Sequence, residues 1–252
     1  MTQSDFAASH YGVRADAYVR SQVHASSEDL DEMEEILGRR RSHNALDLGC
    51  GGGHVSYRAA KYADHIVACD VTPSMLEAVA KEAARKGLEN IETFLASAEA
   101  LPFGAGYFDT VLCRFTAHHW SDFAAGLREA RRVIQAGGAA VFIDTVAPVR
   151  RVLDTHLQAM ELLRDPSHVR NYTVAEWCVL LAEAGFSLQR CTVRRLRMEF
   201  ESWVERTRTP TDTAAAIFRL QRAAPEDVKH YFNIAEDGSF ELDVATLVVE
   251  AI

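Results

Sequence analysis

The sequence predicts an α/β protein built on a doubly wound, mostly parallel β-sheet. Short apolar runs alternate with stretches of helical period over the first 145 residues, as in a sheet that helices cover on both faces. One apolar run, at residues 45–48, leads into a glycine-rich turn and then into a helix, which is how a nucleotide-binding βαβ unit begins. At 252 residues the chain is long enough for one such domain with a cap or insertion.

The composition limits the partners. The formal net charge is −9, which argues against a surface that follows a phosphate backbone, so we expect no nucleic-acid partner. The N-terminus does not resemble a signal peptide, and no apolar run approaches the roughly 20 residues that a membrane span needs. The five cysteines are an odd number without a C-x-x-C pair. They fit a reducing compartment, and we expect a cytoplasmic protein.

Residues 1–40 are expected to form an N-terminal helical segment. Ser26 is a favourable N-cap, apolar residues follow it at helical spacing, and Gly38 ends the pattern. This helix would lead directly into the first strand.

The glycine turn carries the first chemical signal. The chain reads Asp47-x-Gly49-x-Gly51-x-Gly53, and glycine allows both positive φ and close approach of a ligand to the backbone. The spacing differs from a dinucleotide fingerprint, since His54 stands where the third glycine belongs, and the Gly-Lys-Ser/Thr of a P-loop is missing. An acid two positions before the turn would repel a pyrophosphate. It suits a ligand that carries a cationic amine there.

A second acid ends the next strand. Asp70 follows Asp47 at about the 20-residue spacing at which a nucleotide-binding βαβ unit places its ribose-binding carboxylate. The helix after it is well marked, with Thr72 as N-cap, Pro73 at its first position and Gly87 at its end.

The other elements of the core, residues 41–145, continue the alternation. We expect strands over residues 91–96, 108–113 and 139–145, and a helix over residues 121–135 that stops at Gly137 and Gly138.

The C-terminal part, residues 146–252, has a different character. Helices are expected over residues 151–164 and 173–184, the second with a capping box of Thr173 and Glu176, and strands over residues 187–200 and 240–252. The mostly helical stretch at about 201–237 lies between two strands. We interpret it as a cap inserted over the crevice, within one domain of residues 1–252.

Five stretches, in order, resemble the motifs of class I S-adenosyl-L-methionine (SAM) methyltransferases: ALDLGCGGGHVS, CDVTPSML, ASAEALPF, FDTVLCRFTAHHW and RVIQAGG. The chain is most similar to the ubiquinone/menaquinone-biosynthesis-like branch (methyltransferase type 11) and its uncharacterised bacterial relatives. The resemblance implies a Rossmann-like, seven-stranded sheet with an antiparallel last strand and a helical cap insertion. It also implies an enzyme that takes a methyl group from SAM and releases S-adenosyl-L-homocysteine.

The resemblance further implies the role of each cofactor-binding position. The methionine end of SAM would lie at the first strand and its turn, the ribose at the second strand, the adenine between the second and third, and the loop after the fourth strand would contact the methionine part and the substrate. The methionine end would be bound by Asp47, Gly49, Cys50, Gly51 and Gly53, and the ribose by Asp70. The adenine would be bound by Val71, Met75, Ser97, Ala98 and Glu99, and the loop after the fourth strand begins at Arg114.

Ser97 departs from the family pattern, which usually has an aspartate to accept from the adenine amino group. A serine hydroxyl accepts without charge assistance and is the weaker partner. Adenine recognition is then left to the Ala98 N–H or to Glu99.

His118 and His119 are the candidates for a catalytic base, because an imidazole takes up a proton near neutral pH and both follow the fourth strand. The alternative is that they hydrogen-bond the loop around them. Adjacent histidines without a third ligand do not indicate zinc, and we expect no metal. Tyr11, Tyr18 and His24 form either a flap that closes over the methyl group of SAM, with Tyr11 as a cofactor-binding residue, or surface aromatics of the terminus.

The sequence therefore predicts transfer of a methyl group to a small molecule by in-line displacement. Arg114-Phe115-Thr116-Ala117 occupies the place of the Asn/Asp-Pro-Pro-Tyr/Phe motif of nucleic-acid amine methyltransferases. Two alternatives stay open: a SAM-binding protein without methyl transfer, and a nicotinamide oxidoreductase on a similar sheet. The acceptor, its carbon, oxygen, nitrogen or sulfur atom, and the oligomeric state are not indicated.

Overall fold

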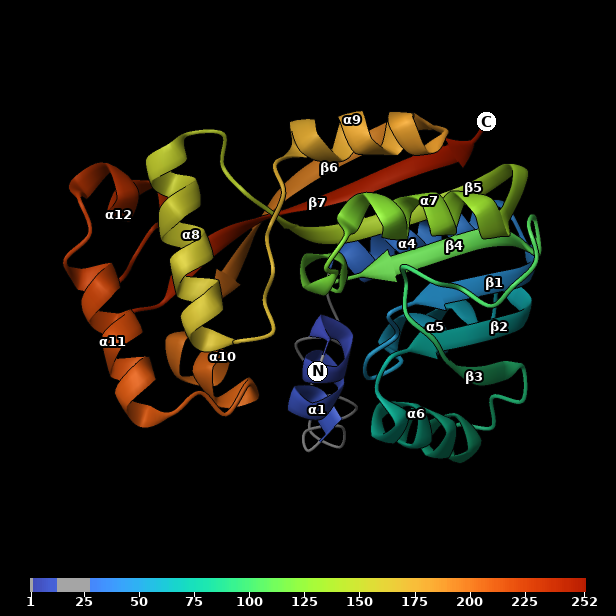
Figure 1. The fold of residues 1–252 in the computed structure, drawn as a ribbon, viewed down its shortest axis with the longest axis horizontal. Helices are drawn as coiled ribbons and strands as arrows, with labels where there is room; N and C mark the ends of the chain where they lie inside the picture. Colours follow the sequence, from blue (N-terminus) through green and yellow to red (C-terminus); the bar gives the residue numbers. More distant parts are fainter. Residues whose placement is uncertain (1, 13–27) are drawn as a thin grey trace.

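A computed structural model describes residues 2–12 and 28–252, and these form a seven-stranded sheet in the order β3-β2-β1-β4-β5-β7-β6 (Figure 1). β7 runs antiparallel to both of its neighbours, and the other pairs are parallel. The predicted doubly wound sheet with an antiparallel last strand is confirmed. The strands are β1 (Ser42–Leu48), β2 (Ala63–Asp70), β3 (Ile91–Leu95), β4 (Phe108–Arg114), β5 (Ile134–Val146), β6 (Phe186–Met198) and β7 (Phe240–Ala251).

Helices cover both faces of the sheet because successive side chains of a strand point to opposite sides. Leu46 and Leu48 of β1 pack in one cluster with α7 (Phe123–Val133) and α9 (Val174–Ala184). Ala45, the residue before Leu46, points to the other face and packs in a second cluster with α4 (Glu28–Arg39) and α5 (His54–Ala59). The central strands are thus buried on both faces, as parallel strands require.

The predicted helix ends are largely confirmed. Thr72 is the N-cap of α6 (Pro73–Arg85), although its side chain makes no capping bond, and Pro73 opens the helix. The capping box of Thr173 and Glu176 is present at the start of α9, and Gly185 ends that helix at φ 96°. Ser26 lies outside the described residues.

Two helix ends were predicted wrongly. Gly38, expected to end the helix before the first strand, lies inside α4, which runs to Arg39. The second error is larger. The helix expected to run to residue 135 ends at Val133, and β5 begins at Ile134 instead of at residue 139. Gly137, at φ 71°, lies inside the strand, next to the point where the register between β4 and β5 shifts. The glycines therefore form a bulge, where one strand has extra residues, and do not mark the end of a helix.

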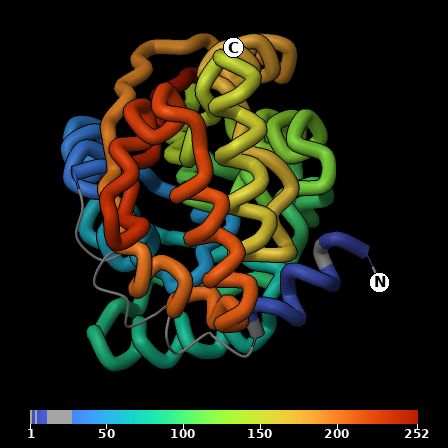
Figure 2. The backbone as a smooth tube through the Cα atoms, turned by 90° about the vertical axis from the view of Figure 1, so that its left-hand side faces the viewer, coloured from blue at the N-terminus to red at the C-terminus, as the bar shows by residue number. Residues whose placement is uncertain are grey.

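A separate group of helices stands at the end of the sheet toward which the parallel strands point (Figure 1). α10 (Phe200–Arg206), α11 (Thr211–Arg222) and α12 (Glu226–Phe232) come from the stretch expected to be a cap. α8 (Arg151–Arg164) packs against α11 and α12, and Figure 2 shows these helices from the side. The three helices share an apolar core. α1 (Gln3–Gly12) lies below the gap between this group and the sheet. None of the described helices is long and apolar enough to cross a membrane.

Candidate active site

A cavity opens at the carboxyl ends of the parallel strands, beside the point between β1 and β4 where the strand order reverses. Ligands of open α/β sheets bind at this position. The cavity continues from the sheet to the helical group. Eleven of the residues that the sequence singled out line it: Tyr11, Asp47, Gly49, Cys50, Gly51, Asp70, Val71, Met75, Arg114, His118 and His119.

Asp47 is 1% exposed and carries one satisfied and one unsatisfied oxygen. Its Oδ2 accepts from the backbone N–H and the hydroxyl of Ser56, at 3.0 and 2.6 Å. Its Oδ1 has no hydrogen-bond partner within the described parts of the chain. Burial raises the pKa of this carboxyl from 3.8 to about 7. A cation at Oδ1 would satisfy the oxygen and restore the ionised form.

The glycine turn is open on the side that faces the cavity. Gly51, at φ 48°, has no atom within 4 Å of the place where a Cβ would stand, so a ligand can lie against its backbone. Gly49, at φ 73°, has the opposite surroundings, since a Cβ there would stand 2.2 Å from Oγ1 of Thr116. Gly49 thus allows the loop after β4 to approach the turn, and Gly51 leaves room for a ligand.

Asp70 is fixed by the turn it faces. Its Oδ2 accepts from the Gly51 N–H and its Oδ1 from the Thr72 N–H, both at 2.9 Å. Burial raises its pKa above the usual value, although hydrogen bonds from Gly51, Thr72 and Val71 act to lower it. The residue also lines the cavity, where a carboxylate can accept from two neighbouring hydroxyls of a ligand.

Four of the expected positions are not among the residues that line the cavity. A Cβ on Gly53 would stand 2.7 Å from the ring of Tyr57, so this glycine serves the packing of α5. Ser97 and Ala98 lie in the turn after β3, and Glu99 accepts from the Ser97 hydroxyl at 3.2 Å. Glu99 also accepts from the hydroxyl of Ser121 and the N–H of Asp122, before α7. In this structure its carboxylate closes the loop and does not reach the cavity.

Arg114 ends β4 and forms an ion pair with Asp29 of α4, both nearly buried and both on the cavity wall. Its guanidinium carbon lies 4.6 Å from the ring centre of Phe115. Phe115 has φ 52°, in the left-handed region that bulky residues rarely adopt. The chain thus turns sharply after Arg114, and the strained residue itself lines the cavity.

His118 is held by a buried aspartate that the sequence analysis did not single out. Its Nδ1 lies 2.6 Å from Oδ1 of Asp144, which sits in β5 and is 2% exposed. Burial alone would lower the pKa of His118, but the charge and hydrogen bond of Asp144 raise it above 6.5. Since Nδ1 is engaged, Nε2 is the nitrogen available to the cavity, the arrangement of a base oriented by a carboxylate.

His119 has a different environment. Its Nε2 lies 3.1 Å from the hydroxyl of Tyr11, and its Nδ1 lies 3.1 Å from the carbonyl of Ser167. Burial and the neighbouring His118 lower its pKa to about 4. The Tyr11 hydroxyl also donates to Asp165, so these residues join α1 to the loop after α8. Both ring nitrogens of His119 thus serve contacts inside the protein.

Tyr18 and His24, the other aromatics of the expected flap, lie outside the described residues. Over residues 2–12 and 28–252, no three His, Cys, Asp or Glu side chains are grouped so that they could hold a metal ion.

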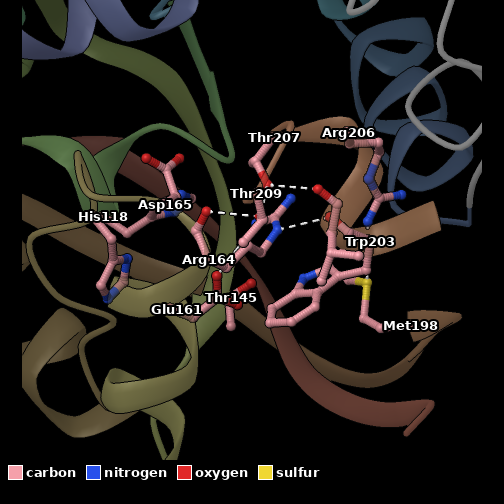
Figure 3. Close-up of polar contacts among 12 residues, drawn as sticks. His118, Thr145, Glu161, Arg164, Asp165, Met198, Trp203, Arg206, Thr207 and Thr209 are labelled. Carbon is pink, nitrogen blue, oxygen red and sulfur yellow. Dashed lines mark hydrogen bonds and ion pairs between the residues drawn. The ribbon is translucent and has the colours of Figure 1, made fainter. Parts of the chain in front are cut away.

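The far end of the cavity is formed by residues that the sequence did not indicate (Figure 3). Trp203 is 1% exposed but also lines the cavity, and the guanidinium carbon of Arg164 lies 4.8 Å from its ring centre. Arg206, Met198 and Asn171 complete this wall. They come from α8, α10, β6 and the loop before α9, so no local sequence pattern links them. Asp144 did leave a signal, since it is a carboxylate inside an apolar strand.

The donor end fits SAM, the methyl donor implied by the sequence motifs. SAM carries a sulfonium, an ammonium and a carboxylate, a cationic total that suits a wall with Asp29, Asp47 and Asp70 against one arginine. The unsatisfied Oδ1 of Asp47 suits the ammonium, the carboxylate of Asp70 suits the two ribose hydroxyls, and the open side of Gly51 leaves room for the chain between them.

Comparisons with known proteins give the family. A family model described as "Methyltransferase domain" matches residues 46–142. YafE of Escherichia coli K12, an uncharacterised protein, is 40% identical over 78% of this chain and 95% of its own. YcgJ of Bacillus subtilis 168, an uncharacterised methyltransferase, is 33% identical over 89% of this chain and 88% of its own. The crystal structure of YcgJ covers 88% of this chain and 97% of that chain with a TM-score of 0.85 at 31% identity. UbiE of Zymomonas mobilis, a ubiquinone/menaquinone biosynthesis C-methyltransferase, is 32% identical over 43% of this chain and 45% of its own.

Proposed function

The chain belongs to the class I SAM-dependent methyltransferases, and we propose that it methylates a small molecule held between the sheet and the helices α8 and α10. One observation supports this most strongly: a single cavity has the SAM-compatible carboxylates and glycines at one end and His118 beyond them. This family membership sets aside the nicotinamide oxidoreductase. A small acceptor also agrees with the acidic net charge of −9.

In this proposal the donor end binds the two charged ends and the ribose of SAM. Asp47 holds the ammonium, the N–H groups of the glycine turn face the methionine part, and Asp70 holds the ribose hydroxyls. SAM supplies a methyl group that its sulfonium already makes electrophilic. The protein's task is then to align the acceptor, to exclude water and, where the acceptor atom carries a proton, to remove it.

We assign the base to His118 and not to His119. The Asp144 carboxylate orients the His118 ring and stabilises its protonated form, and the ring lines the cavity. His119 uses both of its nitrogens for Tyr11 and Ser167. As the bond from the acceptor atom to the methyl carbon forms and the carbon–sulfur bond breaks, the electron pair of the latter stays on sulfur. The acceptor's proton passes to Nε2 of His118.

The test has two readouts, calorimetric binding of SAM and formation of S-adenosyl-L-homocysteine with a panel of small acceptors. Asp70→Ala should abolish binding, whereas His118→Gln should keep binding and lower turnover by about 10²- to 10⁴-fold, the usual contribution of a general base. His43→Gln, which changes a histidine that is 85% exposed at the opposite end of β1, is the matched control. Tight SAM binding without turnover on any acceptor would support the alternative of a SAM-binding protein that does not transfer methyl groups.

A further inference from the structure

We propose that the methyl acceptor is a small organic acid, with its anionic group at Arg164 and Arg206 and its apolar body against Met198 and Leu242. The proposal rests on the proposed function and specifies its substrate class. The methyl-accepting atom belongs to a second group of the same molecule, nearer to His118.

The first support is the way in which charge is divided along the cavity wall. At the donor end Asp29, Asp47 and Asp70 face one arginine, Arg114. At the far end the balance is reversed, because Glu161 is accompanied by two arginines. The wall thus favours a cation where SAM is expected and an anion where the acceptor is expected.

The second support is that Arg164 is held rigidly at the wall. Its Nε donates to the carbonyl of Trp203 at 3.0 Å, its Nη1 lies 3.3 Å from Oε2 of Glu161, and its guanidinium stacks on the Trp203 ring. Its backbone carbonyl accepts from Thr209 at 3.0 Å, which ties the end of α8 to the loop after α10 (Figure 3). A guanidinium fixed in this way loses little freedom when it binds a carboxylate.

The third support is the apolar surface beside the second arginine. Arg206 extends from α10 along Met198, and its Nη2 lies 3.6 Å from the methionine sulfur, a weak acceptor. Met198, Leu196 and Leu242 add thioether and aliphatic carbon to the same wall. Cationic groups next to such a surface match a molecule with an acidic head and an apolar body.

The fourth support is a buried amide. Asn171 is 1% exposed, and its backbone N–H and carbonyl are both held by Gln158, at 3.0 and 2.8 Å. Its side-chain nitrogen has no hydrogen-bond partner in the part of the chain that the structure describes, and the residue lines the cavity. A buried donor left unsatisfied costs free energy, and an oxygen of the acceptor would satisfy it.

The test does not require the acceptor to be known. The full-length protein and SAM are incubated with a small-molecule extract of bacterial cells that has been separated on an anion-exchange column, and S-adenosyl-L-homocysteine is measured in each fraction. We expect product in the retained, anionic fractions. Product found only in the unretained fractions would contradict an acidic acceptor and leave the proposed methyltransferase activity unaffected. SAM binding without product in any fraction would overturn the proposed function and this inference together.

Variants then test the residues. Arg206→Gln should raise the half-saturating amount of the active fraction at least tenfold, as expected for loss of a charge-assisted hydrogen bond, with SAM affinity and melting midpoint unchanged. Asn171→Asp should have an effect in the same direction, because it places a carboxylate where the donor was. Arg208→Gln, an exposed arginine two residues further on, is the control. Equal saturation by wild type and Arg206→Gln would contradict the proposed role of that arginine.

Discussion

We predict that the buried Asp47 makes the affinity for SAM depend on pH, with a size that follows from its surroundings. Its pKa is about 7 in the apoprotein. The ammonium of the ligand has an ordinary pKa of about 7.8, so both partners are charged only in a narrow range. Between pH 7.5 and 5.5 the product of the two charged fractions falls from about 0.5 to about 0.03. We expect the affinity to fall roughly 15-fold, about 1.6 kcal/mol.

The assay is calorimetric titration with SAM at both pH values, on the wild type and on Asp47→Asn. Asp47→Asn keeps the shape of the side chain but removes its charge. Its affinity for SAM at pH 7.5 should therefore be at least tenfold lower than that of the wild type, whereas at pH 5.5 the two proteins should bind SAM with nearly the same affinity. Asp70, whose pKa is also raised by burial, is the competing source of pH dependence. A pH dependence that persists in Asp47→Asn would assign the effect to Asp70.

The stability of the apoprotein gives an independent check, because the ionisation of Asp47 should change it with pH in the direction opposite to the change in SAM affinity. A carboxyl whose pKa rises from 3.8 to about 7 on folding binds a proton more tightly in the folded state. Its contribution to the free energy of unfolding is complete below about pH 4 and is lost as the pH rises through about 7. From pH 5.5 to 7.5, Asp47 therefore destabilises the apoprotein while it strengthens SAM binding. Equal SAM affinity at the two pH values in the wild type would refute the reasoning.

Two further predictions concern the turn and the base. Gly49→Ala should destabilise the fold by about 1–3 kcal/mol in thermal melts, because its φ is 73° and its Cβ would stand 2.2 Å from Thr116. At Gly51 no neighbouring atom lies within 4 Å of the place of a Cβ, so Gly51→Ala should lower the free energy of unfolding only through its positive φ. Its main effect should be weaker SAM binding. The turnover rate should rise with pH through an apparent pKa above 6.5, since His118 acts in its neutral form. Asp144→Asn should lower both that pKa and the rate, and an unchanged profile would contradict the pairing.

The sheet and the donor end could be predicted from the sequence because their signals are local. Asp47, the glycine turn and Asp70 sit at the ends of consecutive strands, and parallel topology brings those ends together. The wrong boundary before β5 has a cause that is not local. Gly137 and Gly138 have the composition of a helix stop, and only the pairing of β5 with β4 makes them a bulge.

The acceptor end could not be predicted, because tertiary packing builds it. Arg164 and Trp203 are far apart in the sequence and meet only because α8 packs beside α10. Trp203 satisfies the pattern of a core residue and is indeed buried, so its place on the cavity wall leaves no separate mark in the sequence. Arg206 has the pattern of an ordinary exposed helix residue.

Asp144 was not singled out from the sequence, although the sequence contains a signal for it. Like Asp47, it interrupts an apolar strand, and such a group costs free energy unless a partner compensates it. Each of the two aspartates satisfies one oxygen and leaves the other without a hydrogen bond among the described residues. An unsatisfied buried oxygen costs about 1–3 kcal/mol of stability. The fold bears that cost at two places where the proposed reaction needs negative charge: beside the ammonium of SAM and behind the imidazole that receives the proton.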